Sequence, residues 1–150
     1  MRLSLAFFLF LSPFLHASLE VVYHIATLNQ WEEVVNEQLA LLDHSGLGSA
    51  CDRLTVTVAG PQIGAVDRIL RRTSFYPKVR LVHASEDVRV CEFPGIEAAL
   101  QIAREKEDAS ILYMHSKGIT HVQSDRGRNV RSWRRYLEYF LIEHWQECVE

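Results

Sequence analysis

The sequence alternates, four times in succession, a short apolar run with a longer segment of helical periodicity. The apolar runs are rich in Val, Ile and Leu, as buried strands are. They cover residues 19–26, 54–59, 79–83 and 110–114. Parallel strands need crossover connections of this kind, and right-handed crossovers are strongly favoured. The pattern predicts an α/β fold with a Rossmann-like, mainly parallel sheet and crossover helices.

Cap and turn residues indicate where the helices begin and end. Asn29, with Glu32 three residues later, predicts a capped helix that stops near Ser45. Pro94 suits the first turn of the third helix, which carries an apolar stripe. That stripe consists of Ile96, Ala99, Leu100 and Ala103.

A loop over residues 115–129 and a long helix to the C-terminus complete the pattern. The residues expected on one face of this helix are Trp133, Leu137, Phe140, Leu141 and His144. Trp133 is expected to pack in the core or in an interface, like Trp145 further along.

Residues 1–17 have the pattern of a secretory signal peptide, because Arg2 precedes an apolar run and Ala17 is small. The run is shorter than the roughly 20 apolar residues of a membrane helix, and Pro13 would interrupt a helix. We therefore expect cleavage after Ala17, no stable transmembrane span and a single domain over residues 18–150. The protein would be secreted or periplasmic, or would stay in the lumen of the secretory pathway. The alternative is an uncleaved anchor or a buried first helix.

The basic residues gather in one stretch of an acidic chain. The formal net charge is −3, which gives no general signal for nucleic acid as a partner. Between His115 and Arg135, however, lie six of the 16 Lys and Arg residues and a single acid, Asp125. Ligands of open α/β sheets bind beyond the carboxyl ends of the strands. Because this stretch follows the fourth strand, it predicts a local anion site.

Lys117 and Gly118 suit a phosphate, since Lys supplies an ammonium group and Gly lets backbone donors approach closely. The start of the last helix adds exposed N–H groups and the positive end of the helix dipole. Ion pairs on the helix surface explain the arginines equally well. Arg134 is four residues from Glu138, and Arg135 is three residues from it.

Three further residues each have more than one interpretation. His115 can act as a general base, donate a hydrogen bond to phosphate, or simply end a strand. Glu92 can bind a sugar or ribose hydroxyl, or cap the third helix. His24, inside the first strand, is expected to be a hydrogen-bonded core residue rather than a ligand. The chain lacks a GxGxxG fingerprint, a GxxxxGK[ST] loop and a GxSxG elbow, so the standard dinucleotide, P-loop and hydrolase functions have no support.

The segment ILYMHSKGITH and the later VRSWRRYLEYFLIEHWQECV resemble a poorly characterised glycosyltransferase-like family of the GT-A, nucleotide-diphospho-sugar transferase type. The stretches YHIATLNQW, SGL and EFPGIEAAL fit the same family. The matching residues near the fourth strand and in the last helix are Tyr113, His115, Lys117, Gly118, Trp133, Arg134, Arg135, Tyr139, Phe140 and Trp145. The resemblance covers nearly all of the chain after the leader.

The resemblance implies the N-terminal, nucleotide-binding half of a GT-A fold, with strand order 3-2-1-4. It implies a protein that binds a nucleotide-diphosphate sugar and transfers the sugar to a carbohydrate acceptor, with His115 in a catalytic role. The implied substrate-binding residues are Lys117, Gly118, Arg131, Arg134, Arg135, Glu92 and Thr27.

The sequence departs from this family pattern in two places. Metal-dependent GT-A enzymes carry an Asp-x-Asp motif after the fourth strand that holds a divalent cation, whereas this chain has His115-Ser116-Lys117. We therefore expect no tightly held metal and no other cofactor, with Lys117 supplying the positive charge. Related proteins continue into an acceptor-binding half, whereas this sequence ends at Glu150. The alternative function is a non-catalytic exported binding module, a degenerate or truncated relative without transferase activity.

Overall fold

The computed structural model describes residues 17–116 and 125–149. It contains one sheet of four strands, in the order β3-β2-β1-β4. The strands are β1 (Leu19–Ala26), β2 (Arg53–Ala59), β3 (Val79–Ser85) and β4 (Ser110–His115). Every neighbouring pair is parallel. The predicted α/β class, the parallel sheet and the 3-2-1-4 order are therefore confirmed.

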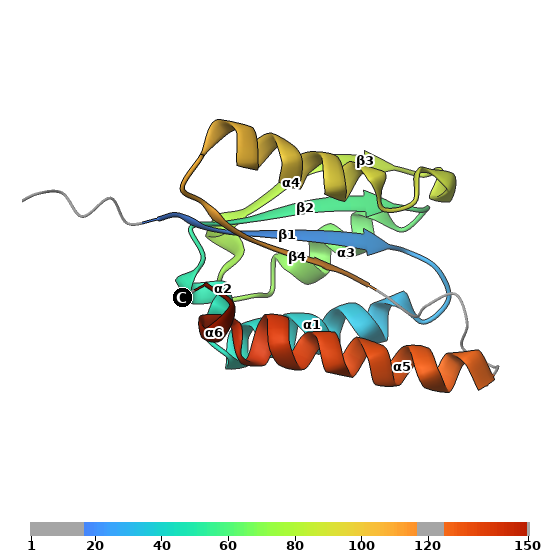
Figure 1. The fold of residues 1–150 in the computed structure, drawn as a ribbon. Helices are drawn as coiled ribbons and strands as arrows, with labels where there is room; N and C mark the ends of the chain where they lie inside the picture. The colour runs from blue at the N-terminus through green and yellow to red at the C-terminus, as the bar shows by residue number, and fades with distance from the viewer. Residues whose placement is uncertain (1–16, 117–124, 150) are drawn as a thin grey trace, which may run out of the picture.

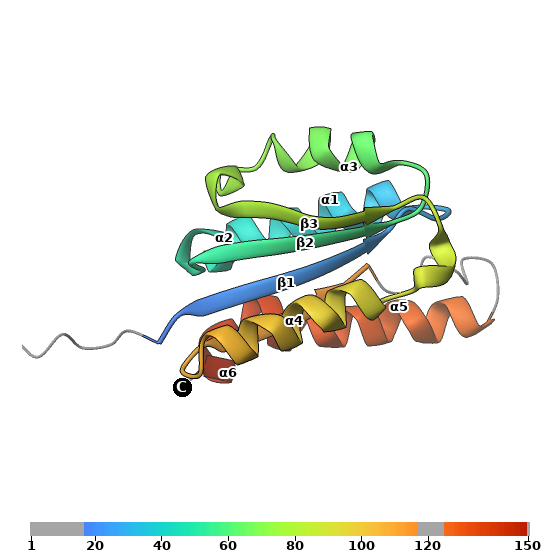
Figure 2. The ribbon, with the colours of Figure 1, turned by 90° about the horizontal axis from the view of Figure 1, so that it is seen from above.

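Helices cover both faces of the sheet (Figure 1). One face is covered by α1 (Trp31–His44), α3 (Ile63–Leu70) and α5 (Asp125–Glu138), and the other by α4 (Phe93–Glu105). The short helices α2 (Leu47–Ala50) and α6 (Trp145–Val149) lie near the amino ends of the strands. Seen from above, α4 and α5 both lie toward the β4 side of the sheet (Figure 2).

The main core lies between the sheet and the layer of α1, α3 and α5. Alternate residues of β1 and β2 point into it, as expected for strands whose side chains alternate between faces. The largest fully buried side chains of this core are Tyr23, Ile25, Leu42, Leu47, Leu54, Leu70 and Ile142. Among the described residues, no helix is long and apolar enough to cross a membrane.

The expected start of the first helix is wrong in detail. The N-cap position of α1 is Gln30, which makes no capping hydrogen bond with its side chain. Asn29 instead adopts a left-handed conformation with φ of 50°. Asn tolerates this region better than most residues because its short side chain can hydrogen-bond locally. Asn29 therefore turns the chain out of β1 and does not cap α1.

The C-terminal helix is present but is not continuous. A π-helical turn over Tyr139–Glu143 separates α5 from α6. The predicted apolar face of this helix is buried only in part. Leu141 packs against the core, whereas Trp133 and Phe140 are 58% and 41% exposed.

Candidate functional site

The carboxyl ends of the four parallel strands meet at one edge of the sheet, on the right in Figure 1. From β1 the chain proceeds to β2 and β3 on one side and then returns to β4 on the other side. Such a switch point forms the crevice in which open α/β sheets bind ligands. The residues that end β1 and β4 therefore define the first candidate site.

Two predicted site residues meet at this crevice. His115 ends β4, and Glu92 directly precedes α4. The Nδ1 atom of His115 lies 3.2 Å from Oε2 of Glu92, and the two side chains are 26% and 47% exposed. Glu92 occupies the N-cap position of α4 but makes no capping hydrogen bond with its side chain. A carboxylate that accepts Nδ1–H fixes the tautomer and the orientation of an imidazole ring.

A row of polar side chains crosses the sheet beside this pair. His24 is in register with Thr57 and with His115, and Thr57 is in register with His83. Nδ1 of His24 lies 2.8 Å from the hydroxyl oxygen of Thr57. His24 is 3% exposed, so the predicted buried, hydrogen-bonded histidine is confirmed. The sheet face under α4 is therefore polar near its carboxyl edge.

Acid should weaken the fold through His24. Burial lowers the pKa of His24 to about 4, and nearby His115 adds to the effect. Because this pKa lies below the unfolded value of about 6.5, the stabilisation is present above pH 6.5 and is lost as pH falls toward 4. We expect a loss of about 2 kcal/mol between neutral pH and pH 4 in denaturant unfolding. His24→Gln should lose less over this interval, and an equal loss in the variant would contradict the assignment.

Tyr113 links the polar row to α4. Its ring stacks on His115 with 6.0 Å between the centroids. A Cβ atom placed on Gly95 would lie 3.0 Å from this ring and from His24 Cβ. The hydroxyl of Tyr113 is buried without a hydrogen-bond partner among the described residues, and burial raises the pKa of Tyr113 to about 12. Gly95 thus lets α4 begin close to the sheet, which brings Glu92 within reach of His115.

Thr27 lies at the same edge, but its hydroxyl already serves the loop after β2. Its side chain is 4% exposed, and its oxygen accepts a hydrogen bond from the backbone N–H of Gln62 at 3.2 Å. The same hydroxyl lies 3.5 Å from the carbonyl oxygen of Ala59, to which it donates. Thr27 thus fastens the connection between β2 and α3. Direct contact with a substrate stays a prediction for this residue.

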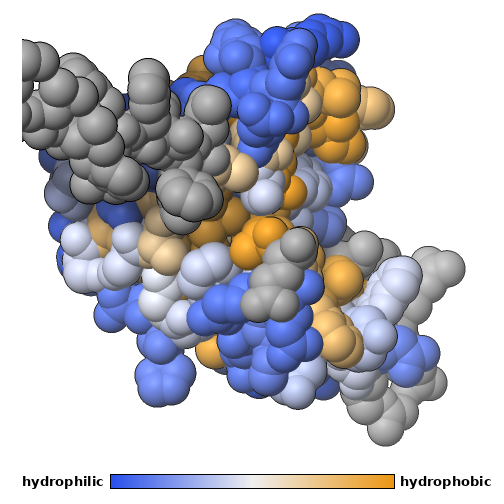
Figure 3. All heavy atoms as spheres, turned by 60° about the vertical axis from the view of Figure 1, so that its left-hand side comes forward, coloured by the Kyte–Doolittle hydropathy of each residue, from blue (hydrophilic) through white to orange (hydrophobic). Residues whose placement is uncertain are grey.

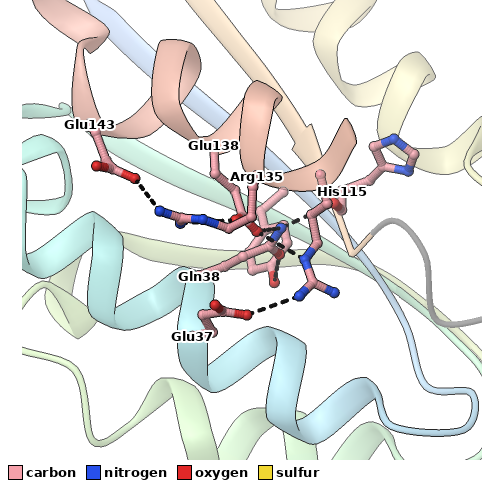
Figure 4. Close-up of polar contacts among 8 residues, drawn as sticks. Glu37, Gln38, His115, Arg135, Glu138 and Glu143 are labelled. Atoms are coloured by element: carbon pink, nitrogen blue, oxygen red, sulfur yellow. Dashed lines mark hydrogen bonds and ion pairs between the residues drawn. The ribbon is translucent and has the colours of Figure 1, made fainter. Parts of the chain in front are cut away.

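The arginines of α5 pair with carboxylates, and Arg135 points toward Glu138 and Glu143, away from His115 (Figure 4). Arg134 is within 3.0 Å of Glu37 and 3.3 Å of Glu138. Arg135 is 3.3 Å from Glu138 and 3.1 Å from Glu143. The ion pairs anticipated from the helix spacing are therefore present, although their shared carboxylate, Glu138, is buried. Arg134 also ties α5 to α1 through Glu37. Arg131, the third predicted arginine, is exposed on α5.

A buried polar chain beneath β4 was not anticipated from the sequence. The hydroxyl of Tyr23 donates to Oε1 of Gln38 at 2.6 Å, and Nε2 of Gln38 donates to Glu138 at 2.9 Å. Glu138 is 3% exposed, and burial raises the pKa of this carboxyl. Gln38 occupies the apolar stripe of α1, between Val35 and Leu42. A polar residue within the apolar stripe of a helix is the sequence signal that could have indicated this buried chain.

A cavity of about 230 Å³ lies beside β4 and α5. Its polar lining comes from Gln38, Glu138, Arg134 and His115, and the rest of its wall is apolar. His115 belongs both to the polar row and to the lining of this cavity, whereas His24 and Thr57 do not line it. Its residues connect the carboxyl end of β4 with the buried chain below.

Lys117 and Gly118 lie outside the described residues, so their contact with phosphate stays a prediction. Within residues 17–116 and 125–149, no three His, Cys, Asp or Glu side chains are placed to hold a metal ion. The described part of the site therefore offers histidine, carboxylate and hydroxyl chemistry.

Comparisons with models of protein families, with curated proteins and with solved structures find no match to this chain. The resemblance to GT-A transferases rests on the residues quoted above, and any function drawn from it is a proposal.

Proposed function

We propose that the protein is glycosyltransferase-like and binds a nucleotide-diphosphate sugar at the carboxyl edge of the sheet, between β1 and β4. The observation that carries this proposal is the Glu92–His115 pair, which joins a carboxylate and an imidazole at the switch point. Nucleotides bind at this place in open α/β sheets. The family resemblance, which includes His115 and the stretch around Glu92, supports the same choice.

The pair has the chemistry that sugar transfer needs. When Nδ1–H of His115 donates to Glu92, Nε2 of the neutral ring is an acceptor and can take a proton from an attacking hydroxyl. When the ring is protonated, the same nitrogen donates to the departing diphosphate and stabilises its charge. The exposed part of the Glu92 carboxylate can accept hydrogen bonds from sugar or ribose hydroxyls.

Positive charge near the same edge supports an anionic ligand. The basic stretch begins with Lys117, directly after β4, and leads into α5, whose first turn lies on the carboxyl-end side of the sheet (Figure 1). A helix start presents backbone N–H groups and the positive end of its dipole to an anion. We propose that Lys117 and this helix start hold the diphosphate. Arg134 and Arg135 contribute more weakly, because carboxylates already neutralise them.

Calorimetric titration with a panel of nucleotide-diphosphate sugars tests the proposal. We expect at least one donor to bind, and we expect His115→Ala and Glu92→Gln each to weaken that binding by roughly tenfold to a hundredfold, as loss of a charged hydrogen bond does. His44→Ala is the matched control, because His44 ends α1 at the far edge of the sheet and should leave affinity unchanged. Absence of binding to every donor would overturn the proposal.

Transfer assays on the same samples separate the two functions that the sequence leaves open. A donor that binds and is consumed in the presence of carbohydrate acceptors identifies a transferase. A donor that binds and stays intact identifies a binding module. The signal-peptide pattern places either function, as a proposal, in a secreted or periplasmic protein or in the lumen of the secretory pathway.

A further inference from the structure

The outer edge of β4 offers backbone groups for another strand. Within the part of the chain that the structure describes, β4 pairs with β1 on one side and ends the sheet on the other. The N–H groups of Ser110 and Ser116 donate toward β1, to Ser18 and His24. Because successive residues of a strand alternate in direction, the N–H and C=O groups of Tyr113 point away from β1.

The two edges of the sheet differ in how they are protected. The ladder of β3 with β2 has a register shift between Val56 and Thr57, and β3 carries Arg80. Such irregularities and charges keep an edge strand from pairing. The ladder of β4 with β1 is regular, and its sequence SILYMH contains no Pro, Lys, Arg, Asp or Glu. The β4 edge therefore lacks the irregular ladder and the charged side chain that hinder the β3 edge from pairing with another strand.

An apolar wall from α4 stands beside this edge. Gly95 faces the sheet, and Ala98 lines a groove with Val82 of β3. At 100° per residue, Ile96 and Leu100 then lie on the opposite flank of the helix, toward β4. They are 41% and 52% exposed. This stripe was predicted from the sequence, and much of it remains open to solvent.

A second wall comes from α5 and the π-helical turn after it, on the other face of the sheet. Tyr136 and Phe140 are 58% and 41% exposed, and their rings are in edge contact with centroids 4.8 Å apart. The cavity beside β4, lined by Leu137 and Leu141, lies at the foot of this wall. Figure 3 shows hydrophobic surface along its right-hand side, which corresponds to the front of Figure 1, where α4 and α5 flank β4.

The exposed apolar area approaches what a stable dimer needs. From their exposed fractions, the four aromatic rings near this edge present roughly 500 Å² together, taking 150–250 Å² for a whole ring. A standard interface buries about 800 Å² on each partner. The rings are those of Phe93, Trp133, Tyr136 and Phe140. Ile96 and Leu100 enlarge this area further.

Charge along the C-terminal helical segment fits an antiparallel copy of itself. Arg131 is exposed in its first half, and Glu147 is exposed near its end. A twofold axis perpendicular to the sheet would set two such segments side by side in opposite directions. Arg131 of each copy would then lie toward Glu147 of the other. The segment is therefore complementary to a second copy of itself.

We propose that the β4 edge binds a second copy of this chain. The two β4 strands pair in antiparallel fashion about a twofold axis, so that the sheet runs continuously through both copies. The α4 stripe and the exposed face of α5 each pack against their counterparts in the partner. This is a closed, isologous interface, the commonest kind in soluble homo-oligomers.

Sedimentation velocity of the purified chain tests the proposal. We expect a dimer at micromolar concentration, with slow hydrogen exchange at the amide of Tyr113. Leu100→Asp and Tyr136→Asp should each raise the dissociation constant roughly a hundredfold, since central apolar residues carry most interface energy. Val82→Asp is the matched control, because Val82 is 56% exposed on the opposite edge strand. It should leave the dimer intact.

Three outcomes would overturn the proposal. The first is a chain that stays monomeric well above micromolar concentration, which would leave the edge to some other partner. The second is a dimer that Val82→Asp dissociates and Leu100→Asp does not. The third is a dimer in which the amide of Tyr113 exchanges as fast as in the monomer. Because all three variants change exposed residues, circular dichroism should show unchanged folding. If Leu100→Asp nevertheless unfolds, Tyr136→Asp still tests the interface through α5.

Discussion

Gly60→Ala is expected to lower the free energy of unfolding by about 3 kcal/mol, from backbone strain and a steric overlap together. Gly60 has φ of 116°, a conformation that residues with a Cβ atom rarely adopt. The added Cβ would also lie 2.4 Å from Oγ1 of Thr27, which is held in place by its contacts with Gln62 and Ala59. Denaturant unfolding monitored by circular dichroism measures the loss.

Gly46→Ala separates the two causes. Gly46 has φ of 77°, and no atom lies within 4 Å of a Cβ placed there. This variant should therefore show strain alone, about 1 kcal/mol. Equal losses in the two variants would mean that the overlap with Thr27 contributes nothing, and the described packing of the loop after β2 would then be wrong.

Glu138→Ala is expected to cost about 3 kcal/mol, because it opens a buried network of charges and hydrogen bonds. Glu138 accepts from Gln38 and pairs with Arg134 and Arg135, so its loss leaves Gln38 without this acceptor and weakens the link between α1 and α5. Glu147→Ala is the control. Glu147 is 73% exposed and pairs only with His144 among the described residues, so its removal should cost less than about 0.5 kcal/mol.

The cost of Glu138→Ala should depend on pH. Burial raises the pKa of Glu138 above its ordinary value. Its contribution is therefore fully present below the unfolded pKa and is lost as pH rises through the folded pKa. The difference between wild type and variant should be larger at acid pH than at alkaline pH. A difference that grows as pH rises would show that the ion pairs outweigh burial.

The strands were predictable because their apolar runs are short, β-branched and bounded by turn residues. β1 begins and ends at the predicted residues, and β4 extends one residue further, to His115. The strand order came from the family resemblance, since periodicity alone carries no information on which strands are neighbours. Lateral order depends on contacts between residues far apart in the chain, which a local pattern does not contain.

The helices show the limit of periodicity more clearly. The spacing of Ile96 and Leu100 correctly identifies an apolar face of α4, but Gly95 and Ile102 are the residues that face the sheet. An apolar stripe indicates that a face will be buried, and it does not say by what. The π-helical turn at Tyr139–Glu143 could not be anticipated, because helical periodicity in the sequence does not mark such a turn.

The site was predictable in part. Glu92 and His115 were both singled out because each follows or precedes an element at the ligand edge, and the structure places them 3.2 Å apart. The charge count could not distinguish arginines that face a ligand from arginines that pair with helix carboxylates. Arg134 and Arg135 do pair with carboxylates, which reduces the predicted anion site to the region of His115 and Lys117.

Hydrogen exchange with and without a nucleotide-diphosphate sugar tests the central claim most directly, because it locates the ligand. We expect slower exchange in peptides that contain the ends of β1 and β4 and the start of α4, around His24, Glu92 and His115. Peptides from the far edge, around His44, should not change. Protection confined to peptides of α5, or no protection at the carboxyl ends of the strands despite measurable binding, would contradict the account.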